Sequence, residues 1–231
     1  MSDTVLLPDQ LLQRSYNISR HLFLIIAFAI VLCNASTISN YWGSHNCQGS
    51  YHRCYNRRAG QCCEDNETFR SAKFGGLPKG PKTCVTNDQD PHDYCGVSQK
   101  AILTFKSTTC LTGNGYAWSG GSIFFDCNYI REQMCLSDRG LERSEDMPDR
   151  DTKLPDIKCT SSHKPDVIGA YGYEFFIYGT DLAKKYGKVA LNDEETKEIL
   201  ALIKESSESS PKDLLAKFGH SAVKEGEIQD E

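Results

Sequence analysis

The stretch CQGSYHRCYNRRAGQCC, residues 47–63, carries four cysteines within seventeen residues. Residues 50–56 alternate with a period of two, which is typical of a half-exposed strand. One face of this strand would carry Tyr51, Arg53 and Tyr55, and the other would carry His52 and Cys54. A turn is predicted at residues 57–60, because Gly60 can adopt a positive φ, and residues 61–63 begin the return strand. Neighbouring residues of a strand point to opposite faces, so we expect Cys62 and Cys63 to bond to different partners on either side of it.

The N-terminal part of the chain has the pattern of a secretory signal. Residues 22–33 form a run of twelve apolar residues, whereas a helix that spans a bilayer needs about 20. Small residues follow, and Ala35 is suitably placed as the last residue before cleavage. We therefore predict a signal peptide over residues 1–35 and a secreted, extracellular protein without membrane attachment after cleavage. The alternative is an uncleaved signal anchor, because the polar segment 1–20 is unusually long.

Cleavage of the signal removes Cys33 and leaves ten cysteines. An even number of cysteines in an exported chain predicts a disulfide framework, here of about five bridges whose pairing the sequence leaves open. Zinc binding is the alternative, but the spacings lack the two Cys-x-x-Cys pairs of a structural zinc site, so we expect no metal and no cofactor. The predicted disulfide cysteines are Cys47, Cys54, Cys62, Cys63, Cys84, Cys95, Cys110, Cys127, Cys135 and Cys159.

Two kinds of glycan contact are predicted. Asn66-Glu67-Thr68 matches the acceptor for N-glycosylation, which predicts a glycan on Asn66. Aromatic side chains in or near loops are candidates for binding a separate glycan, because an exposed ring can stack on the apolar face of a sugar: Trp42, Tyr116 and Trp118. The competing interpretation is that these aromatic side chains cover a thin core and keep one polar end in water.

Alternation of side chains predicts strands at residues 50–56 and 101–106, and residues 122–130 and 171–178 are predicted to be two further strands. Twelve of the 21 residues from 138 to 158 are charged. Residues 136–158 are therefore predicted to be a solvent-exposed loop, called the excursion below. Helical spacing begins only after residue 180, with cap signals at Asn192 and Ser210. We therefore expect an α+β fold. It would have a small disulfide-stabilised antiparallel β core over residues 36–180, two short C-terminal helices in an extension over residues 181–220, and a disordered acidic tail over residues 221–231.

The net charge of the chain argues against a nucleic acid as its partner. The formal net charge is −5, which argues against a nucleic-acid binder held by phosphate contacts. Residues 36–159 contain fifteen basic and fifteen acidic residues, and residues 160–231 contain nine and fourteen, so the C-terminal segment carries the whole excess.

No catalytic arrangement is recognisable in the sequence. There is no Gly-x-Ser-x-Gly motif, and oxidised cysteines offer no reactive thiolate. The sequence therefore favours a protein without enzymatic activity. A hydrolase stays open, because two catalytic carboxylates pair in space and not along the chain.

A set of short segments resembles uncharacterised cysteine-rich secreted proteins of filamentous fungi, over roughly residues 41–135: Cys47–Ser50, Cys54, Ala59–Cys63 and Phe74–Pro78. That group includes small effector-like proteins released toward hosts or competitors. The resemblance implies a host or competitor protein as the partner, and it implies no activity. The aromatic side chains in loops predict a cell-wall glycan as the alternative partner. The leading hypothesis is a secreted interaction protein, effector-like or toxin-like. The others are a carbohydrate-binding or cell-wall-associated protein and a small secreted hydrolase.

We predict that the exported protein begins close to Ser36, because cleavage after Ala35 removes the apolar run. N-terminal sequencing of protein recovered from the medium of expressing cells checks this. Full-length chain in the membrane pellet would support the signal anchor instead.

Overall fold

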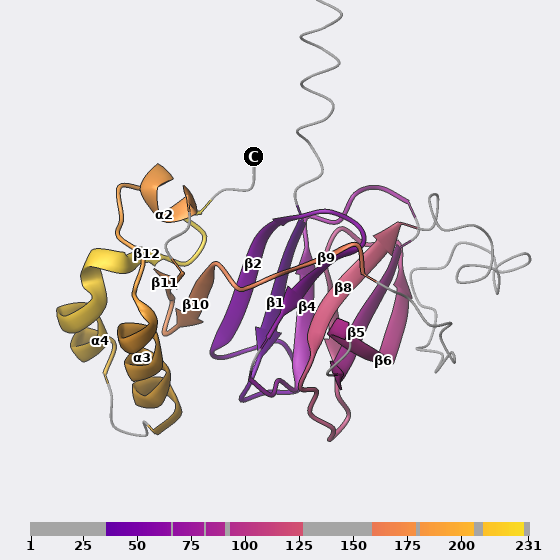
Figure 1. Cartoon of the computed structure of the whole chain (residues 1–231), viewed down its shortest axis with the longest axis horizontal. Helices are drawn as coiled ribbons and strands as arrows, with labels where there is room; N and C mark the ends of the chain where they lie inside the picture. The colour runs from indigo at the N-terminus through magenta and orange to yellow at the C-terminus, as the bar shows by residue number, and fades with distance from the viewer. Residues whose placement is uncertain are drawn as a thin grey trace, which may run out of the picture. The chain divides into compact units, whose positions relative to one another are not determined.

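The computed structural model in Figure 1 describes residues 36–65, 67–80, 82–90, 93–126, 159–178, 181–205 and 210–228. Residues 35–230 belong to one compact unit, and the elements discussed below are all part of it. The predicted signal over residues 1–35, the predicted glycosylation site at Asn66 and the predicted excursion over residues 136–158 lie outside the described residues.

Sheet A contains seven of the described strands, and its pairings are antiparallel. In sheet order the strands are β12 (Ala222–Lys224), β11 (Tyr173–Phe176), β10 (Val167–Ala170), β2 (Tyr51–Arg57), β1 (Ser36–Tyr41), β4 (Ser71–Gly75) and β7 (Thr109–Thr112). Strand β2 therefore joins two parts of the chain, because β1 pairs with one of its edges and β10 with the other.

Sheet B contains five of the described strands. In sheet order they are β6 (Asp93–Thr104), β5 (Lys82–Asp90), β8 (Gly121–Asp126), β3 (Gln61–Glu64) and β9 (Ser161–His163). The pairing of β3 with β9 is parallel, and the other pairings are antiparallel. The strands predicted near residues 50–56, 101–106 and 122–130 correspond to β2, the end of β6 and β8. The strand predicted at 171–178 is shorter, because Tyr171 and Gly172 form a turn before β11 and both have positive φ.

A buried apolar cluster contains side chains from both sheets. Ile38 and Phe74 come from sheet A, Cys84 and Phe124 come from sheet B, and none of the four is more than 1% exposed. The fold class is thus mainly antiparallel β with a few short helices, and the hydrophobic effect of burying these side chains is what holds the sheets together.

The described helices are α2 (Asp181–Lys185), α3 (Asp193–Glu205) and α4 (Pro211–Phe218), followed by the 3-10 helix η2 (Gly219–Ser221). Both predicted caps are confirmed. Asn192 Oδ1 accepts hydrogen bonds from the backbone N–H groups of Glu194 and Glu195, and Ser210 forms a capping box with Asp213. Each cap satisfies backbone donors that the first helical turn leaves without a partner.

The C-terminal extension shares its core with sheet A. Ile199, Leu214 and Phe218 of the helices cluster with Ile168 of β10 and Phe175 of β11. The prediction of a disordered tail from residue 221 is wrong for the described part, because residues 222–224 form β12, the edge strand of sheet A next to β11. Ile228 is also only 6% exposed, so apolar burial orders a segment that its acidic composition suggested would stay in solvent.

Three disulfides cross-link the described residues: Cys47–Cys110, Cys54–Cys63 and Cys62–Cys95. The expectation that Cys62 and Cys63 bond in different directions is confirmed, since Cys63 joins β3 to β2 of sheet A whereas Cys62 joins it to β6 of sheet B. The prediction that Cys84 forms a disulfide is not borne out, because Cys84 is a buried free thiol whose pKa is raised by burial. The pairing of Cys127, Cys135 and Cys159 stays a prediction, and Cys127 and Cys135 lie outside the described residues.

The carboxylate of Glu174 on β11 is fully buried and accepts hydrogen bonds from β2. Its donors are the Tyr51 hydroxyl at 2.9 Å, the Tyr55 hydroxyl at 2.8 Å and Arg53 Nη1 at 2.5 Å. Strand β10 lies between β2 and β11. Its Gly169 lies against the Tyr51 ring, and a Cβ atom on residue 169 would be only 2.1 Å from that ring. The glycine therefore lets side chains of β2 cross β10 and fix β11 in register.

We expect Cys62→Ser and Cys63→Ser each to cut the yield of secreted, folded protein severely. Each change removes a cross-link typically worth about 2–4 kcal/mol and leaves its partner thiol able to form wrong pairs. Cys33→Ser, inside the predicted signal, is the matched control and should leave the yield unchanged. Peptide mapping of non-reduced protein tests the pairing directly, and a bond between Cys62 and Cys63 would contradict the structure.

We expect Arg53→Met to lower the free energy of unfolding by about 3–5 kcal/mol, because it leaves the Glu174 carboxylate buried without its cation. Urea denaturation of the purified protein measures this loss. Arg58→Met, at an exposed position in the turn after β2, is the control and should change stability by less than about 0.5 kcal/mol. Similar losses in the two variants would show that the buried ion pair has no special role.

Candidate functional site

A cleft of about 300 Å³ opens between the β2–β3 region and helix α3. A volume of this order matches the lower end of small-ligand sites. Side chains from the two walls line the cleft: His52, Asp65, Glu67, Lys164, Pro165 and Tyr178 on one side, and Asp193, Thr196, Lys197 and Leu200 of α3 on the other.

The floor of the cleft is a buried histidine–aspartate pair. His52 Nδ1 lies 2.8 Å from Asp65 Oδ1, and the two residues are 5% and 1% exposed. His52 is on β2, and Asp65 directly follows β3. The Trp42 ring packs edge-on against the His52 ring, with the ring centroids 4.5 Å apart, which restricts the imidazole further.

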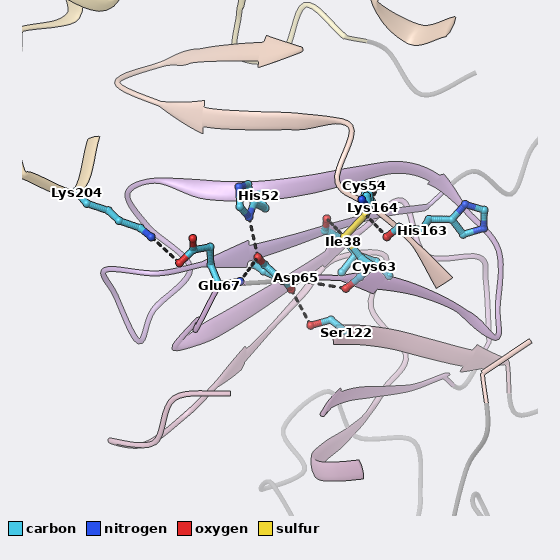
Figure 2. Close-up of polar contacts among 11 residues, drawn as sticks. Ile38, His52, Cys54, Cys63, Asp65, Glu67, Ser122, His163, Lys164 and Lys204 are labelled. Atoms are coloured by element: carbon cyan, nitrogen blue, oxygen red, sulfur yellow. Dashed lines mark hydrogen bonds and ion pairs between the residues drawn. A yellow bond between two sulfur atoms is a disulfide. The ribbon is translucent and has the colours of Figure 1, made fainter. Parts of the chain in front are cut away.

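The Cys54–Cys63 disulfide lies two residues from each member of this pair, as Figure 2 shows. Side chains two residues apart in a strand project from the same face. The disulfide and the His52–Asp65 contact are therefore successive links between the same faces of β2 and the β3 segment. The covalent link holds the two segments at the separation that the imidazole–carboxylate contact needs.

Two oxygen atoms of residues that line the cleft have no hydrogen-bond partner among the described residues. They are Asp65 Oδ2 and Thr196 Oγ1, and Asp65 and Thr196 are only 1% and 2% exposed. The other carboxylate oxygen of Asp65 also accepts the backbone N–H of Glu67 at 3.0 Å. Buried polar atoms are nearly always paired in folded proteins, so two such atoms beside one cleft indicate a place where a ligand group can bind.

Charged and aromatic groups form the rim. Glu67 Oε2 lies 2.5 Å from Lys204 Nζ, as the dashed line in Figure 2 marks. Lys164 Nζ lies 5.3 Å from the centre of the Tyr178 ring, within the range of a cation–π contact. Burial raises the pKa of the Tyr178 hydroxyl, and the carboxylates of Asp193, Asp65 and Glu67 raise it further. The rim near Tyr178 therefore carries both carboxylates and a lysine ammonium.

Tyr178 also has a backbone conformation that an L side chain rarely adopts. Its φ is +59°, and a bulky residue in this region carries a strain of roughly 1–3 kcal/mol. The chain turns here between β11 and α2, so the surrounding structure must hold the ring at the rim of the cleft. Residues under such strain are concentrated at ligand sites, which agrees with the position of Tyr178.

The structure does not bring the three predicted glycan-binding aromatics together into a site. Trp118 is 3% exposed and packs against Phe69, so the expectation that its ring is available to a sugar is wrong. Its place in the cluster between the sheets explains the burial. Tyr116 is 77% exposed in a loop, and Trp42 is half-buried beside His52. Of the three, only Trp42 contacts a residue of the cleft.

Sequence reasoning missed the His52–Asp65 pair, although the sequence contains a signal for it. His52 precedes Cys54 by two residues, and Asp65 follows Cys63 by two residues. If Cys54 and Cys63 are assumed to be bonded across the predicted turn, the same register brings residues 52 and 65 opposite one another. The missing information was the pairing itself, which the ten cysteines leave open.

The cysteines provide the one group of possible metal ligands found among the described residues. The sulfur atoms of Cys62, Cys95 and Cys159 lie within 4.8 Å of one another. Cys62 and Cys95 form a disulfide, and a disulfide sulfur is not the thiolate that binds zinc. The cluster instead brings Cys159, which follows the predicted excursion, next to a cross-link of sheet B.

A second hollow lies near Arg57 and Asp166 and is also lined by Asp181 and Lys185 of α2. Asp166 Oδ2 accepts the backbone N–H of Tyr55 at 2.7 Å and lies 3.8 Å from Arg57 Nη2. Its carboxylate is thus already satisfied, so this hollow is a weaker candidate for a site than the His52–Asp65 cleft.

Among the residues that the structure describes, none of the helices has the length and apolar character needed to cross a membrane.

No curated protein and no solved structure is significantly similar to the chain. Residues 37–166 match the family model ARB_05566_N, an N-terminal domain of uncharacterised proteins. The matched region contains His52, Asp65 and Lys164, whereas Tyr178 and the α3 wall of the cleft lie beyond it. Because this match covers more than half of the 231 residues, the chain belongs to the ARB_05566_N family.

Proposed function

We propose that the protein is a secreted, disulfide-stabilised interaction protein that binds its partner at the His52–Asp65 cleft. The observation that carries the proposal is the pair of buried, unpartnered oxygen atoms of Asp65 and Thr196 beside this cleft. A rigid frame supports a binding role, since a site that is already organised loses less entropy when a partner binds.

The disulfides and the apolar N-terminal run support an extracellular location. Three cross-links among the described residues are compatible with an oxidising compartment, and a twelve-residue apolar run followed by small residues is typical of an export signal. The proposed effector-like or toxin-like role toward a host or competitor protein rests on the resemblance of residues 41–135 to cysteine-rich secreted proteins of filamentous fungi.

Binding fits the lining of the cleft better than catalysis does. No serine or cysteine lines the cleft, so the described residues offer no activated Ser or Cys nucleophile beside His52. A small hydrolase stays the second candidate because of one observation: a buried carboxylate orients the His52 ring, and such a pair can activate a water molecule. Carbohydrate binding loses support, since Trp118 is buried.

We expect Lys197→Trp to abolish partner binding, because Lys197 is exposed on α3 at the rim and an indole there obstructs the cleft. Arrays of secreted and cell-surface proteins and of glycans, probed with the full mature chain, provide the measurement. Lys212→Trp is the matched control, an exposed lysine on α4 that does not line the cleft. It should bind like the wild type.

Two outcomes would overturn this proposal. Partner binding that is equally strong in the Lys197→Trp variant would place the interface elsewhere. Turnover of chromogenic esters or glycosides that is lost in His52→Gln would show that the cleft is the active site of a hydrolase.

A further inference from the structure

The floor of the cleft presents acceptors. Asp65 Oδ2 is an acceptor without a partner. A carboxylate oxygen only accepts, so His52 Nδ1 donates the hydrogen bond to Asp65 Oδ1, and in the neutral ring Nε2 is then an acceptor. Thr196 Oγ1 is a third atom with no partner among the described residues, and its hydroxyl oxygen has lone pairs to offer. These three atoms belong to side chains that line one cleft.

The floor carries one buried negative charge, on Asp65, and the lysines are at the rim. Asp65 is 1% exposed, whereas Lys164 and Lys197 are exposed. Lys164 is near the Tyr178 ring, and Lys204 neutralises Glu67. Asp193 adds a further carboxylate at the rim. Because the charge inside the cleft is shielded from water, it attracts a cation more strongly than exposed charges do.

We propose that the cleft binds a primary ammonium group, in the form of a lysine side chain of the partner; this inference rests on the proposed binding function. An ammonium group has three N–H donors and no acceptor, so it matches three acceptors that come from three side chains. A sugar hydroxyl has a single donor and no charge. An arginine guanidinium is a flat fork that suits one carboxylate approached with both oxygens, and one Asp65 oxygen is already occupied by His52 and by the Glu67 backbone.

The Tyr178 ring supports the same ligand chemistry. It is 38% exposed at the rim, and the structure already places one ammonium, that of Lys164, within 5.3 Å of its centre. The face of an aromatic ring attracts cations, and the carboxylates of Asp193, Asp65 and Glu67 near Tyr178 offset the positive charge of Lys164. The aliphatic part of a lysine side chain would lie along Leu200 and Pro165, which also line the cleft.

The test uses the full mature chain and Nα-acetyl-lysine amide as the probe. Titration followed by ¹⁵N–¹H NMR should give saturable shifts at the backbone amides of Asp65, Glu67 and Thr196. Nα-acetyl-norleucine amide has nearly the same shape but no charge, and it should cause no saturable shift. Glycine amide presents an N-terminal ammonium instead, and binding as strong as that of the lysine probe would show that the cleft recognises chain termini and not lysine.

Variants test the individual acceptors. Thr196→Val keeps the shape of the side chain and should weaken binding roughly threefold to tenfold, as loss of one hydrogen bond does. Asp65→Asn removes the charge and should weaken it roughly tenfold or more. Asp181→Asn is the charge-matched control, since the Asp181 side chain is fully exposed on α2 and does not line the cleft. It should bind with unchanged affinity.

Equal binding of the norleucine probe, or unchanged affinity in both Thr196→Val and Asp65→Asn, would overturn the ammonium inference. So would the absence of any saturable shift with the lysine probe. None of these results depends on the array experiment, in which Lys197→Trp obstructs the cleft whatever the ligand chemistry. Failure of the ammonium site is therefore distinguishable from failure of the binding function.

Discussion

The Cys54–Cys63 disulfide is the constraint on which the rest of the structure depends. It joins β2 of sheet A to β3 of sheet B, immediately across the turn at residues 58–60. Without it, the turn and the buried apolar cluster between the sheets would have to hold the two strands together. Because residues two apart share a face, the same link aligns His52 with Asp65, and Figure 2 shows both links side by side. A covalent restraint at the core thus determines the geometry of the cleft.

The two faces of strand β2 have different structural roles. Tyr51, Arg53 and Tyr55 all bind the Glu174 carboxylate of β11, with Gly169 of β10 leaving room for Tyr51. His52 and Cys54, on the alternate positions, link to the β3 segment. One strand therefore fixes both the C-terminal strands of sheet A and the floor of the cleft, so the stability of the fold and the geometry of the site are coupled.

The cleft is built from two parts of the chain. The floor belongs to the region that matches the ARB_05566_N family, and the α3 wall belongs to the segment after it. Helix α3 is held against sheet A by Ile199, which clusters with Phe175 of β11 and Phe218 of α4. In this arrangement the family domain supplies the buried His52–Asp65 pair together with Glu67 and Lys164 of the rim, and the C-terminal segment supplies Thr196, Asp193 and Lys197. Changes on the exposed side of α3 can alter ligand choice without disturbing the sheets.

Local patterns in the sequence were sufficient to predict several elements. The period of two around Cys54 predicted β2, the cap residues Asn192 and Ser210 predicted α3 and α4, and the adjacent cysteines predicted bonds on both sides of β3. These signals depend on residues close in sequence, where backbone geometry alone fixes which side chains share a face.

The tertiary structure decided everything that depends on contacts between distant segments. It determined which cysteines pair, that Trp118 is buried against Phe69, and that residues 222–224 add a strand to sheet A. It also brought Thr196 beside the His52–Asp65 pair. Such contacts form because separated apolar side chains are buried together, and a local pattern does not specify its distant partner.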